Sequence, residues 1–106
     1  MLGKNAFQMS ELAGIRLPSG LRRLEQMTFW YCKNLKRVEL PDCLEYIGRE
    51  CFQYCPIEKL TLPGTLREVG RDAFSGCGRL EVVHVERGCA LDVESFVGPS
   101  VKVWRK

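Results

Sequence analysis

The sequence predicts an α/β repeat solenoid of about five units of 22–23 residues, with a parallel β-sheet on one face and short helical or 3₁₀ turns opposite. The first observation behind this prediction is the regular spacing of phenylalanine, with separations of 22, 23, 22 and 22 residues: Phe7, Phe29, Phe52, Phe74 and Phe96. The second is a two-residue alternation of apolar and polar side chains after each phenylalanine, the period of a half-buried strand. One strand per unit cannot pair with itself, so the strands must stack in parallel, about 4.8 Å apart.

The repeated unit reads L-x-x-[LIV]-G-x-x-[small]-F-x-x-C-x-x-L-x-x-[VIL]-x-[LV]-P. Stacking such units buries a ladder of aliphatic side chains and a ladder of phenylalanines. We therefore expect residues 1–106 to form a single domain, in which the first unit is incomplete and the last is degenerate.

The strands are expected within "LKRVELP", "IEKLTLP" and "LEVVHVE". The alternation turns these side chains inward: Val38, Leu40, Leu60, Leu62, Val83 and Val85. It turns these outward: Arg37, Glu39, Lys59, Thr61, Val82 and His84. Pro18, Pro41 and Pro63 are expected to end the strands, where a missing N–H is harmless.

The segments "LEYIG" and "LREVG" are expected to turn the corner of each coil. Gly48 and Gly70 are expected there at backbone angles that other residues avoid. The following "RECF" and "RDAF" predict short helical or 3₁₀ turns on the side opposite the strands.

The chain has six cysteines, and four of them occupy small-residue positions of the repeat: Cys32, Cys55 and Cys77, three residues after a phenylalanine, and Cys51, directly before one. A free cysteine behaves as a small buried hydrophobe, so we expect mostly reduced thiols in the core. The spacings lack the paired C-x-x-C units of zinc sites, so no metal or other cofactor is expected. Cys43 and Cys89 lie off the repeated position, and disulfides involving them stay open.

Charge and hydropathy exclude several classes of protein. Basic residues exceed acidic ones by 16 − 13 = 3, without a basic block, which is too weak to predict nucleic-acid binding. No apolar run of about 18 residues predicts a membrane span. The first 20 residues show no secretory signal, so the compartment stays open, and the protein is expected inside a cell if the chain is complete.

The stretch "LPDCLEYIGRECFQYCPIEKLTLPGTLREVGRDAFSGCGRLEVVHV" resembles the BspA-type leucine-rich repeat, whose unit is approximately I-P-x-x-[LV]-x-x-I-G-x-x-A-F-x-x-C-x-x-L-x-x-[IV]-x-[IL]-P. The resemblance implies a leucine-rich-repeat stack and a role in binding other macromolecules, since such repeats occur in surface and adhesion proteins of bacteria and protists. It implies no catalytic residues. The sequence departs from the family pattern at two places: one residue is missing before Ile57, and Pro99 stands in place of the last repeat cysteine.

Catalysis is not expected. The one histidine, His84, would need an orienting carboxylate and a reacting group at one point. Thr61 and Glu39 from adjacent units would lie beside it in a row along the sheet instead of converging.

Two surfaces are candidates for partner binding. The strand face is formed by outward residues: Arg16, Arg37, Glu39, Lys59, Thr61, Val82 and His84. The alternative is that this face is only solvated. The second surface is an aromatic patch of Trp30, Tyr31 and Tyr54, because aromatic residues are enriched at interface cores. Here the alternative is that Trp30 packs in the core.

We therefore predict a non-catalytic protein–protein interaction module that is a small subunit or a fragment of a larger assembly. The chain begins inside a repeat, so a protein partner is expected to cover the open N-terminal end or an exposed face. At the other end, Trp104 is expected to fold over the last coil as a modest cap. The alternative function is a surface adhesion or ligand-recognition domain cut from a longer secreted repeat protein.

Overall fold

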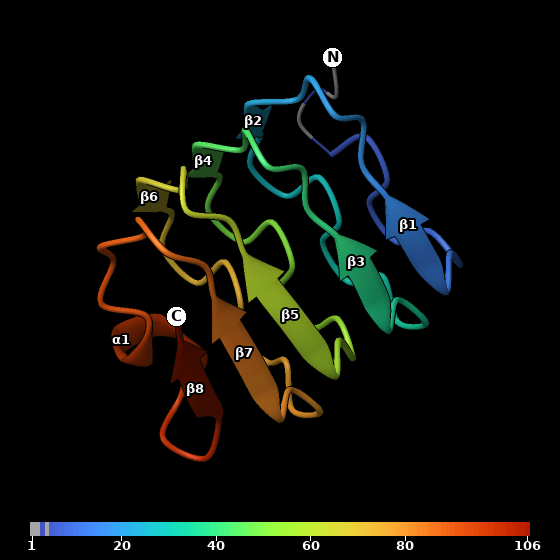
Figure 1. Ribbon diagram of the computed structural model, residues 1–106. Coiled ribbons are helices and arrows are strands. Elements are labelled where there is room, and N and C mark those ends of the chain that lie inside the picture. The colour runs from blue at the N-terminus through green and yellow to red at the C-terminus, as the bar shows by residue number, and fades with distance from the viewer. Residues whose placement is uncertain (1–2, 4) are drawn as a thin grey trace.

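The computed structural model describes residues 3 and 5–106. Met1, Leu2 and Lys4, which the sequence places in the first unit, lie outside the described residues. The chain winds into stacked coils, and each coil adds one strand to a long parallel face (Figure 1). The predicted repeat solenoid is confirmed.

The long face contains five strands: β1 (Gly14–Arg16), β3 (Arg37–Glu39), β5 (Lys59–Leu62), β7 (Val82–Val85) and β8 (Lys102–Arg105). All pairings are parallel, β1 with β3 and β5 with β7 and then β8. Between the two ladders, β3 and β5 lie side by side, and the Glu58 amide donates to the Lys36 carbonyl at 3.3 Å. The expected cap at the C-terminal end is wrong, because β8 extends the sheet and places Trp104 beside His84.

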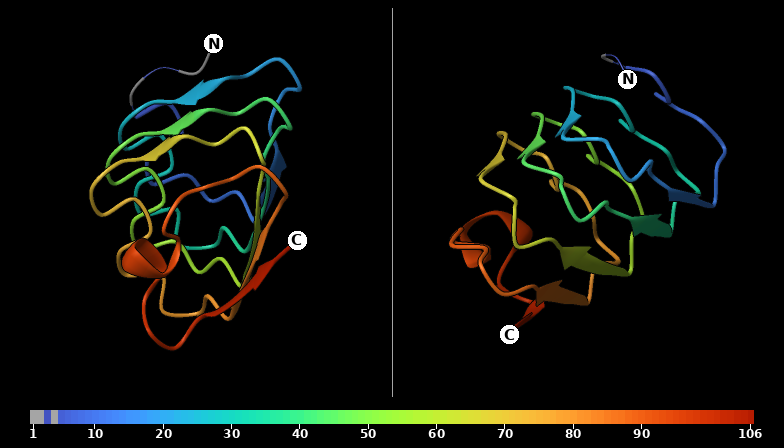
Figure 2. Two further views of the ribbon diagram at one scale, coloured as in Figure 1. Left: turned by 60° about the vertical axis from the view of Figure 1, so that its left-hand side comes forward. Right: turned by 45° about the horizontal axis from the view of Figure 1, so that its top comes forward.

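A second parallel sheet occupies the predicted corner. Its strands are two residues long: β2 (Arg23–Leu24), β4 (Tyr46–Ile47) and β6 (Glu68–Val69). Figure 2 shows these short strands, the long-face strands and the turns on different sides of the coils.

Gly48 and Gly70 follow the short strands, but the expectation of unusual backbone angles is wrong, since neither has a positive φ. Glycine is needed because the backbone of the preceding coil lies where a side chain would begin. A Cβ atom on Gly48 would lie 2.5 Å from the Gln26 amide nitrogen, and one on Gly70 would lie 2.4 Å from the Arg49 amide nitrogen.

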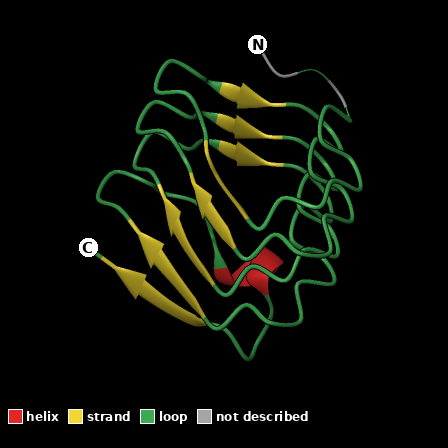
Figure 3. Ribbon diagram, turned by 90° about the vertical axis from the view of Figure 1, so that its right-hand side faces the viewer, coloured by secondary structure: helices red, strands yellow, loops and turns green. Residues whose placement is uncertain are grey.

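The side opposite the strands consists of tight turns, and among the described residues its one α-helix is α1 (Glu94–Val97) (Figure 3). In the first four coils, the residues two before and two after the phenylalanine adopt left-handed φ angles of 53° to 74°: Asn5, Met9, Met27, Tyr31, Glu50, Tyr54, Asp72 and Gly76. Successive amides alternate between a hydrogen bond within the turn and one to the next coil. The Trp30 amide donates to the Met27 carbonyl of its own turn at 3.1 Å, and the Phe29 amide donates to the Cys51 carbonyl of the next coil at 2.9 Å.

The core is a ladder of stacked phenylalanines. The ring centroids of successive phenylalanines are 5.3, 5.2, 5.5 and 5.9 Å apart. The six cysteines are free thiols. Three of them donate to the carbonyl of the phenylalanine one coil earlier, at 3.1 Å for Cys32, 3.0 Å for Cys55 and 3.1 Å for Cys77. The repeat cysteine therefore ties adjacent coils together, in addition to filling space.

Candidate functional site

The residues predicted for the strand face all lie on the long parallel sheet. Val82 is half-buried. The other six side chains are exposed: Arg16, Arg37, Glu39, Lys59, Thr61 and His84. In register, Lys59, Val82 and Lys102 form one row, and Thr61, His84 and Trp104 form the next. The face therefore presents basic, polar and aromatic groups in rows across the sheet.

Arg16 and Glu39 form an ion pair on this face, with 2.6 Å between Nε and Oε2. The hydrogen bond to Glu39 raises the pKa of the Arg16 guanidinium. Both side chains are well exposed, so water and salt screen the pair and it contributes little to stability. Glu39 on β3 and His84 on β7 are not on neighbouring strands, because β5 lies between them.

The strand face offers no converging catalytic group. Thr61 and His84 lie opposite each other in the register of β5 and β7, so they follow the sheet in a row. Within residues 3 and 5–106, no group of three His, Cys, Asp or Glu side chains is placed to hold a metal ion. The face presents hydrogen-bond donors, charged groups and an aromatic ring.

Sequence reasoning did not assign Lys102 and Trp104 to the strand face. Trp104 is 59% exposed and lies opposite His84, and Lys102 lies opposite Val82. The signal that would have found them is the alternation in "SVKVW", which matches the strand pattern of the earlier units.

Trp30, Tyr31 and Tyr54 gather into what we call the aromatic cluster. Their ring centroids lie 5.6 Å apart for Trp30 and Tyr31, 6.3 Å for Trp30 and Tyr54, and 5.8 Å for the two tyrosines. Tyr31 is 45% exposed and Tyr54 49%, while Trp30 is partly buried. The Trp30 indole donates from Nε1 to Oε1 of the buried Gln53 at 2.9 Å, so Trp30 links the cluster to the interior.

The backbone of the turns holds the aromatic cluster in place. Tyr31 and Tyr54 occupy the same left-handed position of successive coils, and their amides donate to the next coil at 2.9 and 3.0 Å. Met9, 62% exposed, holds this position one coil earlier. One coil later it is Gly76, where a Cβ would lie 2.4 Å from Cδ1 of Tyr54, so the Tyr54 ring covers this glycine.

Burial keeps the thiols of Cys51 and Cys77 protonated at neutral pH. Burial raises the pKa of Cys51 to about 12 and that of Cys77 to about 11. Cys51 is buried and Cys77 is half-buried.

A family model for the BspA type leucine rich repeat region matches six copies across residues 1–98. The chain belongs to the BspA-type leucine-rich repeat family. This agrees with the geometry of the stack, in which a long-face strand, a short strand and a turn recur until α1 replaces the turn of the last coil.

Two solved structures share the fold. A leucine rich repeat protein from T. pallidum is 23% identical with a TM-score of 0.56, covering 96% of this chain and 64% of that protein. A leucine-rich repeat protein from Bacteroides ovatus ATCC 8483 is 18% identical with a TM-score of 0.56, covering 99% of this chain and 33% of that one. The chain thus spans 64% and 33% of the two structures it resembles.

The comparison with curated proteins yielded no significant match. In the part of the chain that the structure describes, no helix has the length and apolar character needed to cross a membrane.

Proposed function

We propose that this leucine-rich-repeat chain is a non-catalytic protein–protein interaction module, a small subunit or fragment of a larger assembly, which contacts its partner through the aromatic cluster. The observation that carries the proposal is the surface position of Trp30, Tyr31 and Tyr54, with two tyrosines nearly half exposed. Tyrosine and tryptophan are enriched among the residues that dominate binding energy.

Preorganisation supports the proposal. Both tyrosines sit on backbone fixed by hydrogen bonds to the next coil, and Trp30 is held by Gln53. Side chains that are already ordered lose little conformational entropy when a partner binds. The cluster is therefore suited to be the centre of an interface, with polar residues around it.

The strand face is the second candidate surface for a protein partner. It presents Arg37, Lys59, Thr61 and His84, with the half-buried Val82 among them. Its charges are exposed and mixed, which favours a role in orientation and association rate over affinity. This makes it the right comparison surface for a test of the aromatic cluster.

The test is the native size of the tagged chain in a gentle extract of its own cells, measured by size-exclusion chromatography. Wild type is expected to elute far above 12.1 kDa. The double variant Tyr31→Asn, Tyr54→Asn is expected to shift to its own mass, because asparagine tolerates the left-handed backbone but lacks the ring. The matched control, Arg37→Gln with Lys59→Gln, should stay in the assembly. A monomeric wild type, or an asparagine variant that stays bound, would overturn the proposal.

The second candidate function is a surface adhesion or ligand-recognition domain of a longer secreted protein. The observation that favours it is the length of the similar solved structures, of which the chain spans only 64% and 33%. Reading the gene upstream of the Met1 codon tests it. Further repeats after a signal peptide would support this candidate, and a stop codon directly upstream would exclude it.

A further inference from the structure

The stack is held together on its turn side by a regular set of backbone hydrogen bonds. In the second coil, the amides of Met27, Phe29 and Tyr31 donate to carbonyls of the third coil at 3.0, 2.9 and 2.9 Å. In the third coil, the corresponding amides donate to the fourth coil at 3.0, 2.8 and 3.0 Å: Glu50, Phe52 and Tyr54. Each coil thus offers three donors at two-residue intervals, and the next coil offers three matching acceptors.

The fourth coil breaks this pattern. Its corresponding amides belong to Asp72, Phe74 and Gly76, and within residues 3 and 5–106 they have no hydrogen-bond acceptor. At this point α1 replaces the turn of the fifth coil. The Val93 carbonyl, which would face the fourth coil in a regular turn, accepts from the Phe96 and Val97 amides at 3.1 and 3.2 Å.

The three unpaired amides lie along a cavity of about 600 Å³ between the fourth coil and α1. Asp72, Phe74 and Gly76 line one side of it, and residues 95–98 line the other. Gly78 also lines the cavity and has open space where a side chain would begin. Phe74 is only 4% exposed, so an unpaired amide at this residue carries a free-energy cost that an acceptor would remove.

We propose that this edge of the fourth coil binds an extended peptide segment of a partner protein. The peptide's main-chain carbonyls, spaced two residues apart, accept from the amides of Asp72, Phe74 and Gly76 and so supply the acceptors that α1 does not offer. The donors are spread along an edge instead of converging, which suits a peptide backbone better than a single anion. This mode of binding adds a strand-like segment to an open edge.

The site lies beyond the surface named under the proposed function. The aromatic cluster presents side chains on the second and third coils, whereas this edge presents backbone of the fourth. Binding here is therefore independent of the Tyr31 ring, and the two proposals can fail separately.

Amide hydrogen exchange by NMR on the purified chain is the first part of the test. The amides of Asp72, Phe74 and Gly76 are expected to exchange about 100-fold faster than those of Glu50, Phe52 and Tyr54, which hold the same positions one coil earlier. Equal protection of the two sets would mean that residues 93–97 close the edge themselves, and would overturn the proposal.

The second part is a titration with a capped peptide of residues 48–55, with serine in place of both cysteines, because this segment supplies matching carbonyls inside the stack. The three amide signals are expected to shift and saturate, and Tyr31→Asn should leave this unchanged. Gly78→Trp, which fills the cavity, should weaken binding at least about tenfold. Gly20→Trp, equally open but distant, is the control. Absence of shifts at the three amides, or equal binding by Gly78→Trp, would overturn the proposal.

Discussion

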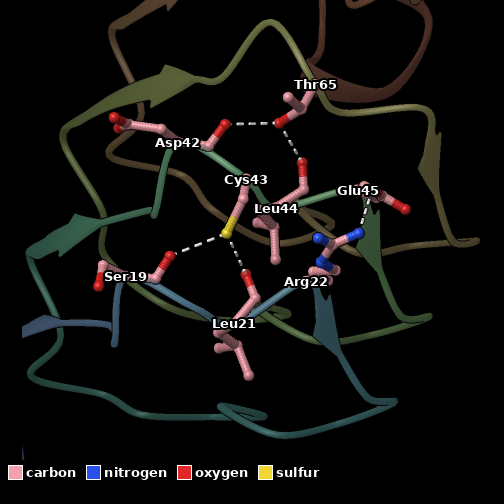
Figure 4. Close-up of polar contacts among 8 residues, drawn as sticks. All are labelled: Ser19, Leu21, Arg22, Asp42, Cys43, Leu44, Glu45 and Thr65. Atoms are coloured by element: carbon pink, nitrogen blue, oxygen red, sulfur yellow. Dashed lines mark hydrogen bonds and ion pairs between the residues drawn. The ribbon is translucent and has the colours of Figure 1, made fainter.

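Cys43 and Thr65 occupy the same position of successive coils and perform the same task. The Cys43 thiol donates to the carbonyls of Ser19 and Leu21 at 2.9 and 3.3 Å (Figure 4). The Thr65 hydroxyl lies 2.7 Å from both equivalent carbonyls one coil later, those of Asp42 and Leu44, and shares its one proton between them. Each side chain joins the loop after a long-face strand to the coil before it.

Replacing Cys43 by threonine should stabilise the fold. A hydroxyl is a stronger donor than a thiol, and Thr65 shows that this position of the repeat accepts the side chain. We expect Cys43→Thr to raise the free energy of unfolding by about 0.5–1 kcal/mol, and Thr65→Val to lower it by about 1–2 kcal/mol. Urea unfolding under reducing conditions measures both. A Thr65→Val variant as stable as wild type would show that these bonds contribute nothing.

Alanine at Gly48 should destabilise the fold strongly. The new Cβ would lie 2.5 Å from the Gln26 amide nitrogen, so two coils would have to separate. We expect a loss of about 2–3 kcal/mol, as for overpacking in a core. Gly20→Ala is the matched control, because nothing lies within 4 Å of its new methyl group. Thermal unfolding followed by circular dichroism compares them, and equal melting temperatures would contradict the close approach.

Stability should fall as the pH rises above about 9. Burial raises the pKa of Cys51 to about 12 and of Cys77 to about 11, from an ordinary value of 9.0. Below pH 9 both thiols are protonated in the folded and unfolded chains, so the stabilisation is fully present. Between about pH 9 and 11 only the unfolded chain releases these protons, and the free energy of unfolding decreases by up to about 1.4 kcal/mol per pH unit for each thiol.

Urea unfolding at several pH values between 8 and 10.5 measures this decrease. Cys51→Ala is the informative variant, because alanine occupies the same repeat position at Ala73. Without this thiol, one proton fewer is released on unfolding at high pH, so the free energy of unfolding should fall less steeply with pH. An unchanged slope would show that Cys51 ionises as readily in the folded chain as in the unfolded one.

The bond between Trp30 and Gln53 should be worth more to stability than the partial exposure of Trp30 suggests. Trp30→Phe leaves the side-chain oxygen Oε1 of the buried Gln53 without its donor, which costs about 1–3 kcal/mol. Adding Gln53→Leu removes the unpaired group, so the double variant should lose less than the sum of the two single losses. Chemical unfolding followed by circular dichroism completes the cycle, and strictly additive losses would contradict the coupling.

The sequence alone determined the period, the parallel stack and the inward side chains of the strands, because each of these repeats along the chain. Phe29 and Phe52 have to stack if their units stack, and alternation alone turns Leu60 inward and Lys59 outward. The exposure of most strand-face residues follows from the same rule. The sequence did not place Trp104 on the strand face, because the last unit departs from the repeat motif, with Pro99 in place of the repeat cysteine.

Tertiary structure decided what depends on contacts between residues about 22 positions apart. Gly48 is required by the backbone of the coil before it, and not by its own φ angle. The turns take left-handed residues such as Tyr54 in place of helix, because alternate amides there bond to the next coil. The Asp72 amide is unpaired because α1 uses the Val93 carbonyl that would have met it in a regular turn. Local sequence sets each coil, and the fit between neighbouring coils sets the exposed surface.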